Sequence, residues 1–485
     1  MSAEKSERDA SWRAELRGAM NAKERAAIPR VKMPELDPAY RVTCNEEVNQ
    51  GISAEQAVLE ATRCMDCPDP QCVNGCPVHI DIPGFIKNIQ RGDFSEAAAT
   101  LRLSSALPAV CGRVCPQEKQ CESRCIYHKM KKEPVAIGYL ERFAADTDRM
   151  FGKNKVERPH SNGIKVAVAG SGPAGLSFAG DMARRGFDVT VFEALHEIGG
   201  VLKYGIPEFR LPNEIVDAEI AALEALGVKF VKDCIIGKTI PVEEMSADGF
   251  KGLFVASGAG LPRFMGIPGE NLIGIMSSNE YLTRVNLMGA GKKGFDTPVA
   301  HGKIAAIIGG GNTAMDSVRT ARRMGAERAI VVYRRSEDEM PARVEEIKHA
   351  KQEGVEFMTL HNPVEYLGDE RGHVRAMLVQ RMELGEPDES GRRSPVPVEG
   401  AIEEIPVDMV IVSVGVSPNP LIPESVPGLK VSRRGTIEVN DSTMESSVDG
   451  LYAGGDIVRG GATVILAMGD GKRAAAAMAD ALLAQ

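Results

Sequence analysis

Eight of the ten cysteines lie in two short stretches near the N-terminus, and this clustering is the strongest chemical signal in the sequence. The first stretch, RCMDCPDPQCVNGCP (63–77), has the spacing C-x2-C-x4-C-x3-C-P and contains Cys64, Cys67, Cys72 and Cys76. The second stretch, CGRVCPQEKQCESRC (111–125), contains Cys111, Cys115, Cys121 and Cys125. Thiols gathered in this way serve disulfides, zinc sites or iron–sulfur clusters.

A glycine-rich loop in the segment IKVAVAGSGPAGLSFAGDMARRGFDVTVFEA (164–194) has the pattern of a dinucleotide-binding βαβ unit. A strand ends in the glycines Gly170, Gly172 and Gly175, a helix follows, and a second strand ends at Glu193. The glycines allow a tight turn and the close approach of a pyrophosphate to the helix N-terminus. Glu193 is placed to accept hydrogen bonds from ribose hydroxyls, so the unit predicts a bound dinucleotide.

The C-terminal segment DGLYAGGDIVRGGATVILAMGDGKRAA indicates that this first dinucleotide is FAD. It resembles the second FAD motif of flavoprotein reductases with two dinucleotide domains. That resemblance implies that Asp456 meets the ribityl and pyrophosphate groups, and that the following helix points its N-terminus at the flavin. The residues that we predict to contact FAD are Gly170, Gly172, Ala174, Gly175, Glu193, Gly200, Leu202, Gly455, Asp456, Thr463 and Val464.

A second glycine loop lies in KIAAIIGGGNTAMDSVRTARRMGAERAIVVYRRSEDEMPA (303–342). Its second strand ends in two arginines instead of an acid. A carboxylate there would accept from the 2′-hydroxyl of NAD, whereas guanidinium groups suit the 2′-phosphate of NADP. The sequence therefore favours NADPH in a second βαβ unit. The residues that we predict to contact it are Gly309, Gly311, Asn312, Thr313, Ala314, Arg334 and Arg335.

A reductase with two bound dinucleotides usually passes its electrons on to an acceptor, and the cysteines could provide one. Neither predicted dinucleotide domain contains a C-x-x-C pair, and Cys234 stands alone, so the electron acceptor must lie elsewhere. The first cysteine stretch is close to the ferredoxin run C-x2-C-x2-C-x3-C-P, whose fourth cysteine serves the other cluster of a pair. Two zinc sites could also take eight cysteines, but zinc would give a flavin no exit for its electrons. We therefore predict two [4Fe–4S] clusters, and counting alone makes Cys111 the eighth ligand.

These elements require about three domains, and 485 residues are enough for them at ~150 residues each. Short Val/Ile runs alternate with helices after residue 160, which is typical of parallel α/β sheets. We predict an α/β fold with two Rossmann-like dinucleotide-binding domains, preceded by an α-helical iron–sulfur domain. The expected ranges are 1–160 for the helical domain, 161–285 and 430–485 for the FAD domain, and 286–429 for the NADPH domain. Segment 383–400 is expected to form a surface hairpin or loop.

Composition excludes several function classes. The net charge is −9 and there is no long basic run, which argues against nucleic acid as a partner. No apolar stretch approaches the ~18 residues of a membrane span, and the charged N-terminus has no apolar signal core. We therefore expect a soluble cytoplasmic protein, in which thiols stay reduced and clustered cysteines hold metal more often than disulfides.

Taken together, these motifs resemble the small (beta) subunit family of bacterial glutamate synthase, from about residue 35 to the end. In detail, CGRVCPQEKQCESRC and EPVAIGYLERFAAD are most similar to the NADP-binding large subunit of the ferredoxin-dependent bifurcating transhydrogenase and to sulfide-dehydrogenase-like members. The resemblance implies a crossed ligand pattern. One cluster would take Cys64, Cys67, Cys72 and Cys125; the other would take Cys76, Cys115, Cys121 and Glu141. Cys111 is then a bystander, in conflict with the simple count.

The resemblance implies an NADPH-dependent FAD and iron–sulfur subunit that passes electrons between NADPH, FAD and the clusters to or from a partner. We expect the cofactors to carry the chemistry and no side chain to act as a catalytic acid, base or nucleophile. The partner would be an amidotransferase-type large subunit or a flavin and iron–sulfur subunit, in a hetero-oligomer. In a bifurcating alternative ferredoxin also binds, for which Lys129, Lys131 and Lys132 offer a basic patch. In an alternative of another class, the helical domain is a zinc-stabilised docking module on a simple flavin reductase.

Overall fold

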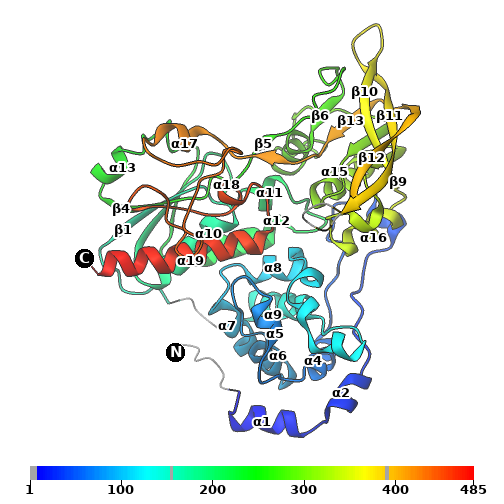
Figure 1. The fold of residues 1–485 in the computed structure, drawn as a ribbon. Helices are drawn as coiled ribbons and strands as arrows, with labels where there is room; N and C mark the ends of the chain where they lie inside the picture. The colour runs from blue at the N-terminus through cyan, green and yellow to red at the C-terminus, as the bar shows by residue number, and fades with distance from the viewer. Residues whose placement is uncertain (1–7, 153–156, 388–390, 392, 485) are drawn as a thin grey trace.

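The computed structural model describes residues 8–152, 157–387, 391 and 393–484, and shows three parts that meet near the middle of the molecule (Figure 1). The N-terminal part is helical, and two parallel-sheet parts follow it. The described part of the chain contains no helix that is long and apolar enough to cross a bilayer. The predicted fold class, a helical domain before two Rossmann-like domains, is confirmed.

The helical part is built from short helices joined by tight turns. Phe85, Ile86 and Ile89 recur at helical spacing and are all buried on one face of α6, as the sequence predicts. The helices are α1 (Ser11–Gly18), α2 (Ala22–Ala27), α3 (Pro38–Arg41), α4 (Ala54–Arg63), α5 (Gln71–Asn74), α6 (Ile82–Gln90), α7 (Phe94–Arg102), α8 (Pro108–Val114) and α9 (Ile137–Phe151), with 3-10 turns η1 (Gln117–Lys119), η2 (Glu122–Arg124) and η3 (Ile126–Met130).

The first sheet is parallel, with strand order β15-β4-β1-β2-β3. Four of its strands precede the second sheet part in the chain, and β15 follows that part. The strands are β1 (Lys165–Ala169), β2 (Asp188–Phe192), β3 (Lys229–Val231), β4 (Phe250–Val255) and β15 (Leu451–Ala453). The helices are α10 (Pro173–Arg184), α11 (Val201–Tyr204), α12 (Asn213–Ala225), α13 (Glu244–Ala247), α17 (Leu421–Ser425), α18 (Asp456–Arg459) and α19 (Val464–Leu483).

The second sheet has the equivalent parallel order, β6-β13-β7-β8-β9. A three-stranded antiparallel sheet covers one side of it and carries the long hairpin at residues 374–406. The hairpin was predicted, although its tip at residues 388–390 and 392 lies outside the described residues. The elements are β6 (Ile275–Ser277), α14 (Ser278–Leu282), η4 (Thr283–Leu287), β7 (Ile304–Ile308), α15 (Asn312–Arg323), β8 (Arg328–Tyr333), η5 (Glu337–Glu339), α16 (Val344–Gln352), β9 (Glu356–Thr359), β10 (His361–Gly368), β11 (Val374–Pro387), β12 (Arg393–Pro406) and β13 (Met409–Val412).

The limits of the inserted part differ from the predicted range 286–429. Strand β6 pairs with β13 and so belongs to the second sheet, although it precedes residue 286. At the other end, Ile422 and Val426 lie in the core of the first sheet part. The chain crosses between the parts at a two-stranded antiparallel link of β5 (Leu261–Pro262) and β14 (Val416–Ser417). A three-residue strand such as β6 leaves no period in the sequence, so its sheet could not be predicted.

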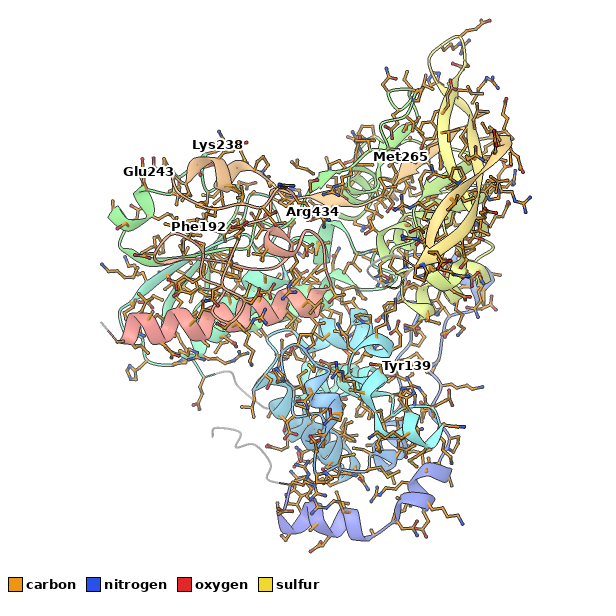
Figure 2. All side chains as sticks on the ribbon, in the orientation of Figure 1. Tyr139, Phe192, Lys238, Glu243, Met265 and Arg434 are labelled. Carbon is orange, nitrogen blue, oxygen red and sulfur yellow. The ribbon has the colours of Figure 1, made fainter. Side chains whose placement is uncertain are left out.

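The helical part packs on the first sheet part through one continuous core. Buried side chains of α6 and α8 share a hydrophobic cluster with those of α10 and α19. Polar contacts reinforce this interface: Glu219 accepts from the Ala109 amide at 2.8 Å and pairs with Arg102 at 3.1 Å. In Figure 2, Tyr139 lies in the helical part and Phe192 in the first sheet part. The cysteine-bearing helices are thus held against the sheet whose loop carries Gly170–Gly175.

A buried ion-pair network joins the N-terminal segment to the second sheet part. The Glu353 carboxylate accepts from Arg41 at 2.8 Å, from Arg319 at 2.8 and 3.0 Å, and from Arg323 at 2.8 Å. The Glu353 side chain is fully buried, and the guanidinium groups of Arg319 and Arg323 lower its pKa to about 2 in spite of its burial. Removing one partner of such a network leaves the others buried without compensation.

We therefore expect Glu353→Gln to destabilise the protein strongly, by about 3–5 kcal/mol. The melting temperature, followed by circular dichroism, should fall by roughly 6–15 °C. The matched control is Glu356→Gln, which removes an exposed carboxylate paired with Arg328 at 2.8 Å and should cost no more than ~1 kcal/mol. Equal melting temperatures for the two variants would contradict the expected role of the network.

Candidate functional site

A cavity of about 1710 Å³ lies where the loops of both sheets meet. The carboxyl ends of the parallel strands open into it, at Ala169, Phe192 and Gly454 on one side and at Ile308 and Tyr333 on the other. Ligands of open α/β sheets bind at this end of the strands. The volume exceeds the ~300–1,000 Å³ of an ordinary small-molecule pocket, which suits more than one dinucleotide.

Most of the predicted cofactor residues line this cavity. Those that do so are Gly170, Gly172, Ala174, Glu193, Gly200, Gly309, Gly311, Asn312, Thr313, Arg334, Arg335, Gly455, Asp456, Thr463 and Val464. The other three, Gly175, Leu202 and Ala314, do not line it. A Cβ on Gly175 would lie 2.0 Å from the Gly170 carbonyl oxygen, and Leu202 and Ala314 are fully buried. These three residues pack the loops that the others present to the cavity.

The middle glycine of each loop is required by neither packing nor backbone strain. Gly172 and Gly311 are the N-caps of α10 and α15, with φ of −68° and −90°, and a Cβ on either would meet no atom of the described residues within 4 Å. Each therefore faces open space at a helix N-terminus. That is the geometry in which a pyrophosphate approaches the backbone. The structure thus contains two anion cradles of the same design.

We expect Gly172→Ala and Gly311→Ala each to weaken the binding of a different cofactor. Each added methyl group fills one cradle, so the first variant should hold FAD at least about tenfold more weakly and the second should raise the KM for NADPH by a similar factor. Bound flavin and steady-state kinetics measure these effects. Gly18→Ala, which adds a methyl group to open space far from the cavity, is the control. If both substitutions affected only FAD, the assignment of the second loop would be wrong.

Glu193 shapes the first loop. Its carboxylate accepts from the Ser171 amide at 2.9 Å, from the Ser171 hydroxyl at 2.5 Å and from the Leu195 amide at 2.9 Å. The Ser171 hydroxyl oxygen in turn accepts from the Gly199 amide at 2.9 Å. Sequence reasoning missed Ser171, whose only signal was its position between two loop glycines. The network links the end of β2 to the loop that precedes α11.

The C-terminal motif is held by a second carboxylate that the sequence analysis did not single out. Asp470 on α19 is fully buried and accepts from the Gly455 amide at 3.0 Å and from Arg459 at 2.6 Å. Asp456 accepts from the Ala462 amide at 2.9 Å, and burial raises the pKa of its carboxyl. The Thr463 side chain caps α19 by accepting from the Leu466 amide. The helix therefore begins at the cavity wall.

The two arginines after β8 have different surroundings. Arg334 is exposed at the cavity wall, whereas Arg335 is buried and its Nε donates to the Arg393 carbonyl oxygen at 2.9 Å. Arg335 thus holds the long hairpin against the strand. Between the two sheet parts, Arg210 pairs with Asp316 at 2.7 Å, and both residues line the cavity. Tyr204 lines it too, and burial raises the pKa of its hydroxyl to about 12.

The cysteines form two neighbouring groups, one on the side of α4 and one against α19. All ten are free thiols, so a disulfide framework is absent from the chain. Burial and the nearby Cys64 and Cys125 raise the pKa of Cys67 to about 11, and the same neighbours raise the pKa of Cys72. These thiols form the first group, which we define as Cys64, Cys67, Cys72 and Cys125. Three of its members are only half-buried.

The second group is more deeply buried. A hydrogen bond to Cys111, burial and the nearby Glu141 and Cys121 raise the pKa of Cys115. Burial, Glu122, Cys76 and Glu141 do the same for Cys121. We define this group as Cys76, Cys115, Cys121 and Glu141. Thiols crowded together in this way ionise only where a cation or cluster compensates their charge.

Glu141 and Cys111 differ in where they point. Glu141 on α9 is buried, its Oε1 has no hydrogen-bond partner among the described residues, and burial raises its pKa to about 8. The Cys111 Sγ lies 3.5 Å from the Met468 Sδ on α19 and 4.0 Å from the Ser105 hydroxyl. A buried carboxylate without a partner fits a ligand position. The Cys111 thiol contacts both Met468 and Cys115, so the first contact fits a packing role and the second fits a ligand position.

We expect Glu141→Ala to alter or abolish the EPR signal of the cluster in the second group, because a carboxylate ligand sets its charge and potential. Cys111→Ala should leave that signal and its potential unchanged. The two variants form a matched pair at neighbouring buried positions. The reverse outcome, with the signal lost only in Cys111→Ala, would restore the simple count of eight cysteine ligands.

The spacing of the thiols also bears on zinc. Four thiolates at ~2.3 Å from a tetrahedral zinc ion lie ~3.8 Å from one another. Among the described residues, Glu35, Glu345 and His349 form the one set of three or more potential ligands whose donor atoms all lie within 4.8 Å, and it contains no cysteine. Neither cysteine group therefore contains three donor atoms that all lie within 4.8 Å of one another.

Comparison with known proteins agrees with this geometry. The family described as dihydropyrimidine dehydrogenase domain II, 4Fe-4S cluster, matches residues 41–153, and the pyridine nucleotide-disulphide oxidoreductase family matches residues 164–480. The glutamate synthase [NADPH] small chain of Halomonas elongata is 35% identical over 93% of this chain and 96% of its own length. The chain belongs to the glutamate synthase small-chain family.

The chain is also similar to a protein with a different name. The beta subunit of the NADP(+)-dependent formate dehydrogenase of Moorella thermoacetica is 39% identical over 83% of this chain, which spans 59% of that subunit's length. Among solved structures, Mycobacterium tuberculosis FprA in complex with NADPH matches with a TM-score of 0.55, over 66% of this chain and 85% of FprA, at 20% identity. That likeness supports the two-domain reductase fold. The chain is an NAD(P)H-dependent oxidoreductase with a 4Fe-4S domain.

Proposed function

We propose that this protein is the NADPH-linked electron-transfer subunit of a larger redox complex. FAD would lie along the Gly170–Gly175 loop, NADPH along the Gly309–Ala314 loop, and one [4Fe–4S] cluster in each cysteine group. The observation that carries the proposal is the position of Cys115. Its chain neighbours Val114 and Pro116 both line the dinucleotide cavity, so the second group borders the cofactor space. The first group lies beyond it, toward the surface.

Bound FAD supplies the link between the two-electron chemistry of NADPH and the one-electron chemistry of the clusters. The protein's own residues position and insulate these groups. Gly172 and Gly311 would admit the pyrophosphates, Arg334 would bind the 2′-phosphate, and Asp456 would lie beside the sugar side of the flavin. Met468 on α19 contacts Cys111, which lies beside the second group. The half-buried thiols of the first group form the exit toward a partner.

For the partner, we propose a second redox subunit in a hetero-oligomer. The relationship to glutamate synthase small chains supports an amidotransferase-type large subunit, whereas the 39% identity to a formate dehydrogenase beta subunit favours a flavin or iron–sulfur partner of another kind. Ferredoxin remains the acceptor in the bifurcating alternative. Of the three lysines proposed to attract it, Lys132 donates to the Ala26 carbonyl oxygen. The free thiols support a reducing, cytoplasmic location.

Anaerobic affinity purification of the tagged chain from its native cells tests the proposed partnership. Co-purification of an amidotransferase-sized chain would assign glutamate synthesis to the complex. A flavin or iron–sulfur chain would assign ferredoxin-linked or formate-linked electron transfer. Recovery of the chain alone, with full NADPH oxidation activity toward a small dye, would overturn the proposal that it works as a subunit.

A further inference from the structure

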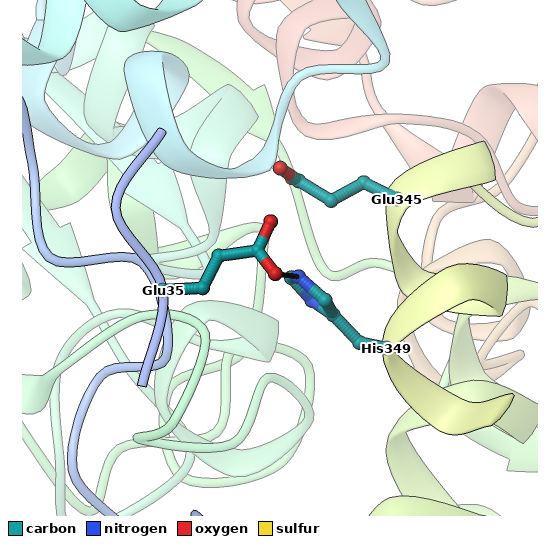
Figure 3. A group of neighbouring side chains, drawn as sticks. All are labelled: Glu35, Glu345 and His349. Carbon is teal, nitrogen blue, oxygen red and sulfur yellow. Dashed lines mark ion pairs between the residues drawn. The ribbon is translucent and has the colours of Figure 1, made fainter. Parts of the chain in front are cut away.

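Three side chains outside the cofactor region converge at the contact between the N-terminal segment and α16 (Figure 3). Glu35 comes from the segment that precedes α3, and Glu345 and His349 lie one turn apart on α16. Their donor atoms all lie within 4.8 Å of one another. Glu35 is fixed in place by a backbone bridge to Asn49. The three residues belong to segments about 310 positions apart in the chain, so only the fold brings them together.

His349 gives an independent sign of a missing partner. Its side chain is buried, with 1% relative exposure, and its Nε2 has no hydrogen-bond partner among the described residues. The Nε2 nevertheless lies 3.4 Å from the Glu35 Oε2. A buried imidazole that lies beside a carboxylate without a hydrogen bond to it leaves room for a shared cation.

The distance between the two ligand atoms has the value that a metal would impose. Nitrogen and oxygen ligands at ~2.0–2.1 Å from a tetrahedral zinc ion lie ~3.3–3.4 Å apart. We propose that Glu35, Glu345 and His349 bind one divalent transition-metal ion, such as Zn²⁺, that joins the N-terminal segment to the second sheet part. One imidazole and two carboxylates suit Zn²⁺ better than Mg²⁺, which requires six oxygen ligands in an octahedron. Water would complete the coordination.

The charges nearby leave the required oxygens accessible. Lys348, whose side chain is 53% exposed, holds the Glu35 Oε1 at 2.8 Å, while the Oε2 faces His349. Arg343 lies 3.3 Å from the Glu345 Oε2, and Arg41 lies 3.8 Å from the Glu35 Oε2. Arg41 is engaged mainly by Glu353 at 2.8 Å. Because Glu35 and Glu345 are only half-buried, an ion can reach the site from solvent.

Zinc binding to the cluster-loaded full chain, under anaerobic conditions, tests this site. After exposure to Zn²⁺ and gel filtration, wild type should retain one more equivalent of zinc than Glu345→Gln and His349→Gln, at equal iron content. Affinity for Zn²⁺ should fall at least tenfold in both variants, and Mg²⁺ should not compete. His373→Gln is the control, because it removes an exposed histidine that lies 3.8 Å from Asp369 and has no second carboxylate in its pair. This variant should bind zinc like wild type.

The melting temperature distinguishes a loss of zinc binding from misfolding of a variant. Zn²⁺ should raise the melting temperature of wild type and of His373→Gln, but not of Glu345→Gln. The Glu345 side chain is 17% exposed, so its amide variant should fold even if His349→Gln does not. Equal zinc content or equal thermal shifts in wild type and Glu345→Gln would overturn the proposal. Zinc that appears only as iron is lost would also overturn it, because the ion would then occupy the cysteine groups.

Discussion

Cys72→Ala should stop electron delivery to a protein acceptor while leaving NADPH-dependent flavin reduction intact. Cys72 belongs to the first group, lies near Cys64, Cys125 and Cys67, and does not line the dinucleotide cavity. Its loss should remove one cluster, so that iron falls from about eight to about four atoms per chain. The rate of ferredoxin reduction should drop by more than the roughly 10–100-fold that outer-shell changes cause at metal sites.

Cys44 lies outside both groups and provides a control for this result. Its thiol contacts the Arg41 carbonyl oxygen, whereas Cys234 is less suitable because it lies in the core of the first sheet part and also lines the cavity. Cys44→Ala should keep all iron and full transfer rates. Rapid-reaction absorbance separates flavin reduction from acceptor reduction. If Cys72→Ala slowed flavin reduction and acceptor reduction equally, the first group could not be the exit toward a partner that we propose.

Arg334→Glu should reverse the preference of the enzyme for NADPH over NADH. The guanidinium at the cavity wall is the group best placed for a 2′-phosphate, and a hydrogen bond to a charged group contributes about 1.5–3 kcal/mol. The KM for NADPH should therefore rise by roughly 10–100-fold through lost binding, and further through repulsion, while the KM for NADH changes less than about threefold.

Arg328→Gln is the control for charge on the same strand, because Arg328 lies at the opposite end of β8 and pairs with exposed Glu356. It should leave the ratio of the two KM values unchanged. Arg335→Met should instead weaken the hairpin contact to Arg393 and lower stability more than cofactor preference. An Arg334→Glu enzyme that still prefers NADPH as strongly as wild type would place the 2′-phosphate elsewhere.

Much of the fold could be predicted because its signals are local. The βαβ units can be recognised from glycine spacing, apolar runs and the residue that ends the second strand, all within about thirty positions. The family relationship and the 4Fe-4S domain follow from equally local cysteine spacing, and both are confirmed by the comparisons. The approach of the two loops to one cavity also follows, since ligands bind at the carboxyl ends of parallel strands.

The parts that could not be predicted depend on contacts between distant segments. The pairing of β6 with β13 joins residues 275–277 to 410–412, and it moved the boundary of the inserted part. Arg41 reaches Glu353 across more than three hundred positions, and Arg210 reaches Asp316 across more than one hundred. Such charged residues look like ordinary surface residues in sequence, because nothing local shows that the fold will bury them together.

The same reason explains the uncertainty over the eighth cluster ligand. Spacing alone favoured Cys111, whose contact with Met468 arises only when the C-terminal helix packs on α8. Glu141 carries no cysteine-like signal, and its unpartnered oxygen becomes visible only in the folded protein. The surroundings of these two chemically reasonable residues are visible only in the tertiary structure, and the variants described above test which of them is the ligand.

The most direct test of the proposed electron path is anaerobic metal analysis of the purified chain, combined with EPR after reduction by NADPH. We expect one FAD, iron and sulfide near eight each, and two distinct [4Fe–4S] signals that develop with NADPH alone. We also expect no zinc in the cysteine groups. Two equivalents of cysteine-bound zinc with little iron, or iron that NADPH cannot reduce, would contradict the claim that this chain carries electrons from its dinucleotide cavity through both cysteine groups.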